Sequence, residues 1–252
     1  MATPKELVRV AATADLHYNR ASHGGLQTLF AQVSDAADVL LLCGDLTDHG
    51  LPEEAQILAK ELTAVVRVPV IAVLGNHDYE SGKQAEVRQI LADAGTHLLD
   101  GDTFEVLGIG FAGVKGFGGG FGPRALQPWG EASIKQFVQE GVDEALKLES
   151  ALARLRSPER IVLLHYSPIR DTVEREPPEI FAFLGSSRLE EPLNRYSVTK
   201  VFHGHAHHGS PEGRTSAGIP VYNVSQKLLQ HSFPDQPPFR LLEISVKQQP
   251  GT

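Results

Sequence analysis

The chain has 252 residues, of which 41% are hydrophobic, and this is enough for one large domain with a buried core. Its formal net charge of −8 disfavours nucleic acid or an anionic membrane surface as the default partner. A single cysteine, Cys43, excludes an intrachain disulfide, residues 1–6 lack an apolar signal core, and no stretch approaches the roughly twenty apolar residues that span a bilayer. We therefore expect a single domain over residues 1–252, with a cytoplasmic location and no membrane partner.

Short apolar runs alternate with helical patterns over residues 7–94. Buried strands are predicted at residues 7–14, 39–43 and 68–74, where short runs rich in β-branched and aliphatic residues stop at a polar residue or a glycine. Helices are predicted at residues 30–37, 52–66 and 84–94, of which the second opens on Pro52 and the third ends at Gly95. This alternation predicts a parallel sheet whose faces are covered.

The pattern changes after Gly95. Three short strands at residues 97–99, 103–107 and 109–114, with turns between them, predict an antiparallel part of the fold. A long helix is predicted at residues 131–155, with a break near Gly141, and buried strands follow at residues 161–164 and 198–202. Residues 219–224 and 239–246 are expected to be closing strands, and the Pro- and Glu-rich residues 175–179 to form an exposed loop over the site edge.

Five polar clusters stand at or just after the ends of apolar runs. They are Asp15-Leu16-His17, Gly44-Asp45-Leu46-Thr47-Asp48, Gly75-Asn76-His77-Asp78, His165 and Gly204-His205-Ala206-His207. Because the carboxyl ends of parallel strands meet at one edge of a sheet, we expect these side chains to converge. Any one aspartate could instead be a turn or cap residue, and His165 alone a core histidine, so the prediction rests on the joint pattern.

The clusters combine oxygen and nitrogen ligands in a set that fits Mn, Fe, Zn, Co or Ni better than Ca or Mg. No thiolate belongs to the clusters, which disfavours a closed structural zinc site. Residues two apart on an extended backbone point the same way, so Asp15 and His17 are expected to hold one ion together. His205 and His207 have the same spacing but can serve different ions. Two metal ions about 3.5–4 Å apart suit the hydrolysis of a phosphate ester.

Taken in order, the motifs D-x-H, G-D-x-x-D, G-N-H-D, H and G-H-x-H resemble those of the calcineurin-like metallophosphoesterase superfamily, over roughly residues 7–225. The resemblance implies an α/β (mixed α+β) fold. It is a four-layer αββα sandwich of two mixed β-sheets flanked by helices, with the metal site at the C-terminal ends of the strands. The resemblance also implies a ligand set in which Asp45 bridges two ions, with Asp15, His17 and His207 on the first and Asn76, His165 and His205 on the second.

The same resemblance implies the roles of the groups around the metals. A hydroxide between the two ions would attack phosphorus in line. His77 would lie over the substrate, where it stabilises the transition state or protonates the leaving oxygen, and Asp48 would orient His77. Asp78 is expected either to fix the turn or to take part in catalysis. Of the other histidines, His203 is expected behind the ligands, and His49 and His208 at the rim or in solvent.

Departures from individual subfamilies narrow the expected activity. The second and third motifs lack the phosphate-clamping arginines of the protein Ser/Thr phosphatases, and the second lacks the metal-bound tyrosine of the purple acid phosphatases. His77 stands where the lipid-A-pathway hydrolases carry arginine, and the segment after His207 is short for the DNA-capping domain of Mre11-like nucleases. We therefore expect a phosphodiesterase acting on a small organic phosphate or a cyclic nucleotide. The alternatives are a phosphomonoesterase, or a non-catalytic interaction module such as the metal-free retromer subunit of similar fold.

A glycine-rich segment at residues 115–129 is the main candidate for substrate choice. Its glycines could form a mobile flap, and Phe117, Phe121 and Trp129 could stack on a base or an aryl group. The alternative is a connecting loop whose aromatic side chains pack locally. No Gly-Lys-Ser/Thr sequence follows, which excludes a nucleotide-binding P-loop.

Overall fold

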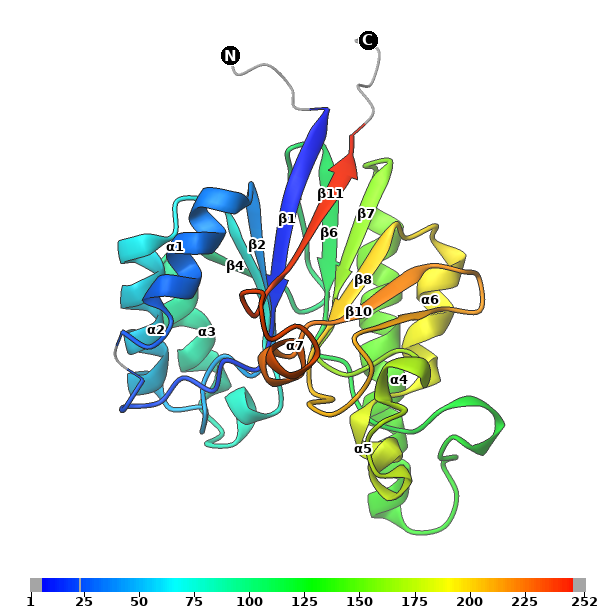
Figure 1. Ribbon diagram of the computed structural model, residues 1–252. Coiled ribbons are helices and arrows are strands. Elements are labelled where there is room, and N and C mark those ends of the chain that lie inside the picture. Colours follow the sequence, from blue (N-terminus) through cyan, green and yellow to red (C-terminus); the bar gives the residue numbers. More distant parts are fainter. Residues whose placement is uncertain (1–5, 23, 247–252) are drawn as a thin grey trace.

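Two β-sheets pack face to face between two layers of helices in the computed structural model, which describes residues 6–22 and 24–246 (Figure 1). The expected mixed α/β architecture, with two mixed sheets flanked by helices, is confirmed. His23 and residues 1–5 of the segment predicted to lack a signal core lie outside the described residues. Within the described ranges, no helix is long and apolar enough to cross a bilayer.

The first sheet has the strand order β11-β1-β2-β3-β4 and the second the order β5-β6-β7-β8-β10-β9. The strands are β1 (Leu7–Thr13), β2 (Val39–Cys43), β3 (Val70–Val73), β4 (Thr96–Leu98), β5 (Thr103–Val106), β6 (Ile109–Gly113), β7 (Glu159–Leu163), β8 (Lys200–His203), β9 (Glu212–Arg214), β10 (Pro220–Asn223) and β11 (Arg240–Ser245). In each sheet four strands run parallel, β1 to β4 in the first and β6, β7, β8 and β10 in the second. The antiparallel strands β11, β5 and β9 pair at the edges.

Five of the seven helices in the described residues cover the outer faces of the sheets, whereas α5 (Phe181–Leu184) and α7 (Gln226–Ser232) lie below the strands in Figure 1. The five are α1 (Gln27–Ala36), α2 (Pro52–Val65), α3 (Gln84–Asp93), α4 (Ala132–Arg154) and α6 (Glu190–Arg195). One buried cluster joins α1, α2 and α3 to the first sheet, and another joins α4 and α6 to the second. In Figure 1 these two helical layers stand on opposite sides of the paired sheets.

The strand β2 shows why continuous apolar runs form this core. Leu40 and Leu42 point to the helices outside the first sheet, whereas Val39, Leu41 and Cys43 point to the space between the two sheets. Side chains alternate across a strand, so a strand buried on both faces needs apolar residues at every position. Cys43 is fully buried and acts as a small apolar side chain, as its sequence context predicts.

Two expectations about individual segments are wrong, and a third holds except at one residue. β4 does not belong to the antiparallel part, because α3 carries the chain back so that β4 pairs parallel to β3. α4 runs unbroken through Gly141, where the glycine serves packing: a Cβ would lie 3.0 Å from the Gly118 carbonyl oxygen. Residues 175–179 are mostly exposed, but Glu176 is buried and accepts a 2.6 Å hydrogen bond from the His208 amide.

Candidate metal centre

The five polar clusters come together at one edge of the two sheets, at the bottom of the strands in Figure 1. The first sheet delivers three of them, after β1, β2 and β3, and the second sheet delivers the other two, after β7 and β8. Three groups of histidine and carboxylate side chains have ligand atoms within 4.8 Å of one another: Asp15, His17 and His207; His17, Asp45 and His77; and Asp45, His165 and His205. Among the described residues, these groups hold six of the seven candidate ligands together with His77, and the seventh, Asn76, contacts His165. We call Asp15, His17 and His207 the first set, and Asn76, His165 and His205 the second set.

Asp45 lies between the two sets. Its Oδ2 is 3.9 Å from His17 Nε2, and its Oδ1 is 3.4 Å from His165 Nε2, so each carboxylate oxygen faces one set. On the far side of the first set, Asp15 Oδ1 is 3.2 Å from His207 Nε2. On the far side of the second, Asn76 Oδ1 is 2.9 Å from His165 Nε2. This arrangement fits the expectation that Asp45 bridges two ions.

Left-handed backbone marks the same residues. The non-glycine residues with positive φ in the described ranges include Asp15 (59°), His17 (45°), Asp45 (48°) and His205 (70°). Such φ values are uncommon for residues with a Cβ and persist where the surrounding structure enforces them, which is typical of functional sites. The turn after each of β1, β2 and β8 therefore aims its side chains at a backbone cost of about 1–3 kcal/mol per residue.

The donor set fits metal ions. His17 Nε2 is buried without a hydrogen-bond partner, although buried ring nitrogens normally have one. The atom lies 3.9 Å from Asp45 Oδ2, and His17 belongs to two of the three groups. Oxygen and imidazole ligands without a thiolate are the combination preferred by Mn, Fe, Zn and related ions. An ion between these groups would satisfy the unpaired nitrogen and offset the carboxylate charge.

Backbone carbonyls determine which ring nitrogen carries the proton in the histidines of the second set, because a carbonyl can only accept a hydrogen bond. His165 Nδ1 lies 3.0 Å from the Cys43 carbonyl oxygen and must donate to it, so Nε2 faces Asp45 and Asn76. His205 Nε2 lies 3.1 Å from the Phe183 carbonyl oxygen, which leaves Nδ1 for an ion. These contacts fix the tautomer in the way that is typical of metal-binding histidines.

Burial and the close charges shift several pKa values in the centre. Burial alone would lower the pKa of His165, but the Asp45 carboxylate raises it to about 9. Burial would in turn raise the pKa of Asp45, but His165 holds it well below its usual range. Burial, followed by the charge of His165, lowers the pKa of His205 to about 4. Without an ion, the His165 ring thus carries a second proton at Nε2, beside Asp45 and Asn76, and metal binding would displace it.

Asp78 fixes the turn that carries Asn76 and His77. Its side chain is fully buried and accepts hydrogen bonds from the amides of Leu46 (3.2 Å), Thr47 (2.8 Å) and Gly75 (2.8 Å), and from the Thr47 hydroxyl (2.6 Å). Burial and the Asp45 charge raise the pKa of Asp78 to about 6, although the hydrogen bonds from Gly75 and Thr47 lower it. The carboxylate ties the loop after β2 to the loop after β3, which supports the expectation that it fixes the turn.

Gly75 allows the same two loops to approach. A Cβ at this position would collide with Asp45 Oδ1 and lie 2.8 Å from His165 Cε1. The glycine of the G-N-H-D motif is therefore required by the close packing of two candidate ligands.

His77 is held by the backbone of Asp48, and the atoms involved differ from the expected pairing. His77 Nδ1 lies 2.7 Å from the Asp48 carbonyl oxygen, and the His77 ring packs edge-on against His17 with 4.6 Å between centroids. The Asp48 carboxylate lies 3.4 Å from His17 Nδ1 and 3.6 Å from His49 Nε2. The carbonyl accepts the Nδ1 proton, so Nε2 of His77 remains available for substrate.

A buried polar network supports the turn after β8. His203 is fully buried, and burial lowers its pKa to about 4, so the ring is neutral. Its Nδ1 donates to the Gly204 carbonyl (2.7 Å) and its Nε2 accepts from the Thr172 hydroxyl (2.8 Å). Asn223 Nδ2 donates to the Ala206 carbonyl (2.7 Å). His203 thus lies behind the ligands as expected, whereas Thr172 and Asn223 have no local motif that could reveal their role.

Residues at the rim include one that the sequence reasoning missed. His49 is exposed and lies 3.6 Å from Glu80 Oε2, and the same Glu80 oxygen is 3.6 Å from His77 Nδ1. Glu80 lies two residues after the third motif and three residues after His77, at the end of a helical turn. This spacing is the signal in the sequence that could have indicated its position near His77. His208 is exposed, as expected.

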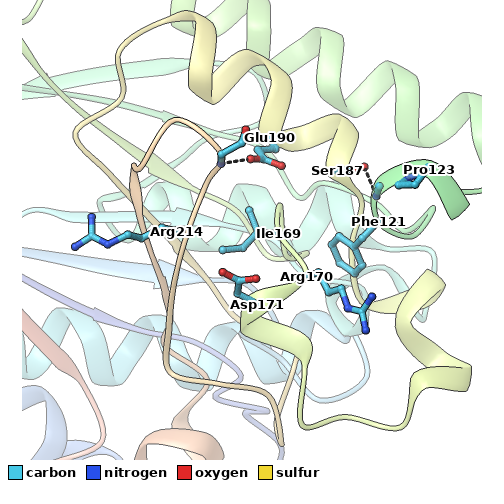
Figure 2. Close-up of a pocket in the computed structure, with 10 residues that line it drawn as sticks. Phe121, Pro123, Ile169, Arg170, Asp171, Ser187, Glu190 and Arg214 are labelled. Atoms are coloured by element: carbon cyan, nitrogen blue, oxygen red, sulfur yellow. Dashed lines mark hydrogen bonds between the residues drawn. The ribbon is translucent and has the colours of Figure 1, made fainter.

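The three aromatic residues of the glycine-rich segment do not act together. Phe117 lines a pocket that Asn76 and His205 also line. Trp129 is 72% exposed. Phe121 lines a separate pocket of about 390 Å³, in which Ile169 and Arg170 face it (Figure 2). Arg170 in that pocket is paired with Glu174 at 3.6 Å, and Arg214 donates to the Gly218 carbonyl at 2.9 Å, so both guanidinium groups are engaged elsewhere.

Comparison with known proteins gives one family and several structures. The model of the family described as calcineurin-like phosphoesterase matches residues 8–209. No curated protein sequence matches the chain. The phosphopantetheinyl hydrolase PptH of Mycobacterium tuberculosis is 14% identical over 92% of this chain and 95% of its own, with a TM-score of 0.66. The protein TT1561 of Thermus thermophilus is 14% identical over 96% of this chain and 100% of its own, with a TM-score of 0.55. GAP50, the anchor in the inner membrane complex of Plasmodium, is 14% identical over 88% of this chain and 73% of its own, with a TM-score of 0.53. At these identities the structures share the fold with this chain.

Proposed function

Because the chain belongs to the calcineurin-like phosphoesterase family, and is therefore a phosphoester hydrolase, we propose that it cleaves small phosphodiesters at a dinuclear centre built from the seven candidate ligands. The observation that carries the proposal is the position of Asp45, with one carboxylate oxygen towards His17 and the other towards His165. A single carboxylate between two sets of ligands is what a pair of ions requires. We propose Mn, Fe or Zn as the native metals, because the donors are oxygen and imidazole.

We assign Asp15, His17 and His207 to the first ion, Asn76, His165 and His205 to the second, and Asp45 to both. When bound, the two ions would supply a nucleophile at neutral pH and neutralise charge on the phosphoryl oxygens. The chain's own contribution is to hold the ligands in place, through the left-handed turns at Asp15, His17, Asp45 and His205. The buried Asp78 adds to this by tying two of the turns together.

We assign the proton transfer to His77. Its Nδ1 proton is held by the Asp48 carbonyl at 2.7 Å, so a second proton on the ring must sit at Nε2. That proton can pass to the leaving oxygen of the ester, and a positioned acid of this kind contributes about 10²–10⁴-fold to rate. The backbone amide of His77 also donates to Asp45 Oδ1 at 2.9 Å, which fixes the ring relative to the bridging carboxylate.

A diester is preferred to a monoester on grounds of charge. A monoester dianion is commonly held by arginines, whose paired N–H groups match two phosphoryl oxygens. The second and third motifs, between Gly44 and Glu80, contain no arginine beside the ligands. A singly charged diester needs less neutralisation, so it is the better match. A phosphomonoesterase is the second candidate, and a cyclic nucleotide is one possible diester.

One buried free cysteine and the acidic chain agree with a cytoplasmic protein without nucleic-acid partners.

The test is hydrolysis by protein stripped with a chelator and reloaded separately with Mn, Zn or Fe. The panel is matched alkyl and aryl phosphate mono- and diesters together with cyclic nucleotides, and metal content is measured on each sample. We expect two ions per chain, no turnover in the stripped protein and faster turnover of diesters than of monoesters. The proposal is wrong if protein with two bound ions hydrolyses no ester, and its diester part is wrong if monoesters are faster.

A non-catalytic interaction module remains the alternative from a different class. GAP50, described as an anchor, shares the fold at a TM-score of 0.53. This chain, however, keeps a candidate ligand at each motif position, and these side chains converge in space. Loss of turnover in His77→Ala with an unchanged metal content would favour the enzyme over the module.

A further inference from the structure

Four aromatic side chains form a pocket beside the metal centre. Phe117, Phe137, Tyr166 and Phe183 line a cavity of about 210 Å³ together with Asn76 and His205, two of the candidate ligands. The aromatic residues come from four segments: the loop after β6, α4, the residue after His165, and α5. We call this cavity the aromatic pocket. Its four aromatic walls lie outside the motifs, and the proposed chemistry does not use them.

The aromatic pocket is continuous with the second set of ligands. The Tyr166 ring packs 4.5 Å from the His205 ring and 5.5 Å from the His165 ring, measured between centroids. The Phe183 carbonyl accepts from His205 Nε2 at 3.1 Å, which joins α5 directly to the centre. A group in the pocket would therefore lie beside Asn76 and His205, two of the ligands assigned to the second ion.

The size and shape of the pocket suit one planar ring. The Phe117 ring is inclined by 54° to Phe137 at 4.8 Å and by 43° to Tyr166 at 5.7 Å, and Phe137 meets Phe183 edge-on at 6.0 Å. Inclined walls of this kind offer both ring faces and ring edges to an aromatic occupant. A cavity of about 210 Å³ is smaller than the roughly 300–1,000 Å³ of sites for drug-sized ligands. A single ring system fits this space better than a long chain.

A cation behind the pocket disfavours the other usual occupant of an aromatic cage, a quaternary ammonium group. The buried Lys115 ammonium lies 4.8 Å from the centroid of Phe117 and 5.3 Å from that of Tyr166. Its Nζ donates to the Gly116 carbonyl at 2.8 Å, which keeps it against these rings. The two rings therefore already face a cation, and a second cation in the pocket would be repelled. An uncharged group meets no such penalty.

We propose that the aromatic pocket binds an uncharged aromatic substituent of the phosphate ester and so selects aryl- or arylmethyl-type substrates. This inference rests on the proposed function and deepens it by naming the substrate class of the same site. Phe183 contributes an exposed wall, since 58% of the residue is accessible, whereas Tyr166 is buried at the boundary with the ligands.

The test compares esters of four alcohols that differ in the group that would enter the pocket. All four carry an aliphatic carbon on the ester oxygen, so that the leaving groups stay similar. Ethyl, cyclohexylmethyl, benzyl and choline esters are assayed as methyl diesters and as monoesters on Mn-loaded protein. We expect kcat/KM to be highest for the benzyl ester, about tenfold above the ethyl ester, and lowest for the choline ester. A cyclohexylmethyl or choline ester that is turned over as efficiently as the benzyl ester would overturn the proposal.

Variants connect the preference to the pocket. Phe183→Ala is expected to lower the benzyl-to-ethyl ratio of kcat/KM about three- to tenfold. Trp129→Ala, a similarly exposed aromatic residue outside the pocket, is the matched control and should leave the ratio unchanged. An equal loss in both variants, or no loss in Phe183→Ala, contradicts the assignment.

Binding separates this inference from the proposed function. Benzylphosphonate and ethylphosphonate are titrated calorimetrically into Mn-loaded wild-type protein and the Phe183→Ala variant. If no ester is hydrolysed, the proposed function fails, yet tighter binding of benzylphosphonate that is lost in Phe183→Ala would still support the pocket. Equal binding of the two phosphonates would overturn the pocket whatever the outcome of the assays.

Discussion

The metal centre and the aromatic pocket share a boundary at Asn76 and His205 but are built in different ways. In the centre, each ligand follows directly on a strand within a short motif, and the local backbone is constrained by left-handed turns. In the pocket, each ring comes from a separate segment without a motif, and the wall at Phe183 is exposed. The centre should therefore tolerate almost no substitution, whereas the pocket should change its preference with little effect on the fold.

The largest expected effect is at the bridging carboxylate. Asp45→Asn should lower kcat/KM by more than about 10³-fold, because an amide offers one neutral oxygen where both sets of ligands face an anion. Metal content should fall below two ions per chain. Asp93→Asn on the surface of α3, where the carboxylate accepts from Gln89, is the control and should keep both ions. Full activity and two ions in Asp45→Asn would refute the bridging role.

The next effect is at the proposed acid. His77→Gln should lower kcat about 10²–10³-fold with both ions retained, since His77 moves a proton and is not assigned to a metal. His49→Gln tests the specificity of this loss, because His49 is exposed at the same rim and shares the contact with Glu80. A similar loss in the two variants would mean that the charge of the rim, rather than proton transfer by His77, is responsible.

Asp78→Asn tests whether the centre is held by a buried carboxylate. Three backbone amides and a hydroxyl point at Asp78, and the amide group of asparagine cannot accept from all of them. The free energy of unfolding should fall by about 2–4 kcal/mol in denaturant titrations. Asp102→Asn, which removes an exposed pair with Arg88, should cost less than about 1 kcal/mol. Equal costs would contradict the structural role of Asp78.

A smaller effect is expected from the close approach at Gly75. Gly75→Ala should weaken metal affinity about 10–100-fold, because the added Cβ displaces Asp45 and His165. Gly95→Ala strains a left-handed backbone (φ 89°), but its Cβ would meet nothing within 4 Å, so this variant should leave metal affinity unchanged. Competition with a chromophoric chelator measures both values. An unaltered affinity in Gly75→Ala would show that the turn after β3 yields more easily than its packing indicates.

The smallest effect is predicted for the pocket wall. Phe183→Ala should change the free energy of unfolding by less than about 0.5 kcal/mol, because most of the side chain is accessible. By contrast, Phe111→Ala in the fully buried core between the sheets should cost about 3–5 kcal/mol. If Phe183→Ala destabilises the protein as much as Asp78→Asn does, the contrast between the centre and the pocket is wrong.

Local sequence was sufficient for most of the elements in the first half of the chain. β2 occupies the predicted residues 39–43, and α2 ends one residue before its predicted end. Both depend on short-range patterns, a buried apolar run and a proline-opened helix. β4 shows the limit: the strand was expected within a residue of its place, but its direction depends on the pairing partner that α3 brings to it. Gly141 reads as a helix breaker in sequence because the approaching Gly118 carbonyl is distant along the chain.

The sequence by itself determined the family, and it predicted the candidate ligands and their order along the chain, because each candidate ligand lies in a motif near the end of a strand. Tertiary structure alone decided which atoms meet. It placed the Asp48 carbonyl rather than its carboxylate on His77, put Asp45 between two sets of ligands, and assembled the aromatic pocket from four segments. The physical reason is the separation along the chain between the residues that interact. Motifs record constraints on neighbouring residues, whereas carbonyl directions and cavity walls arise from packing between residues far apart in the chain.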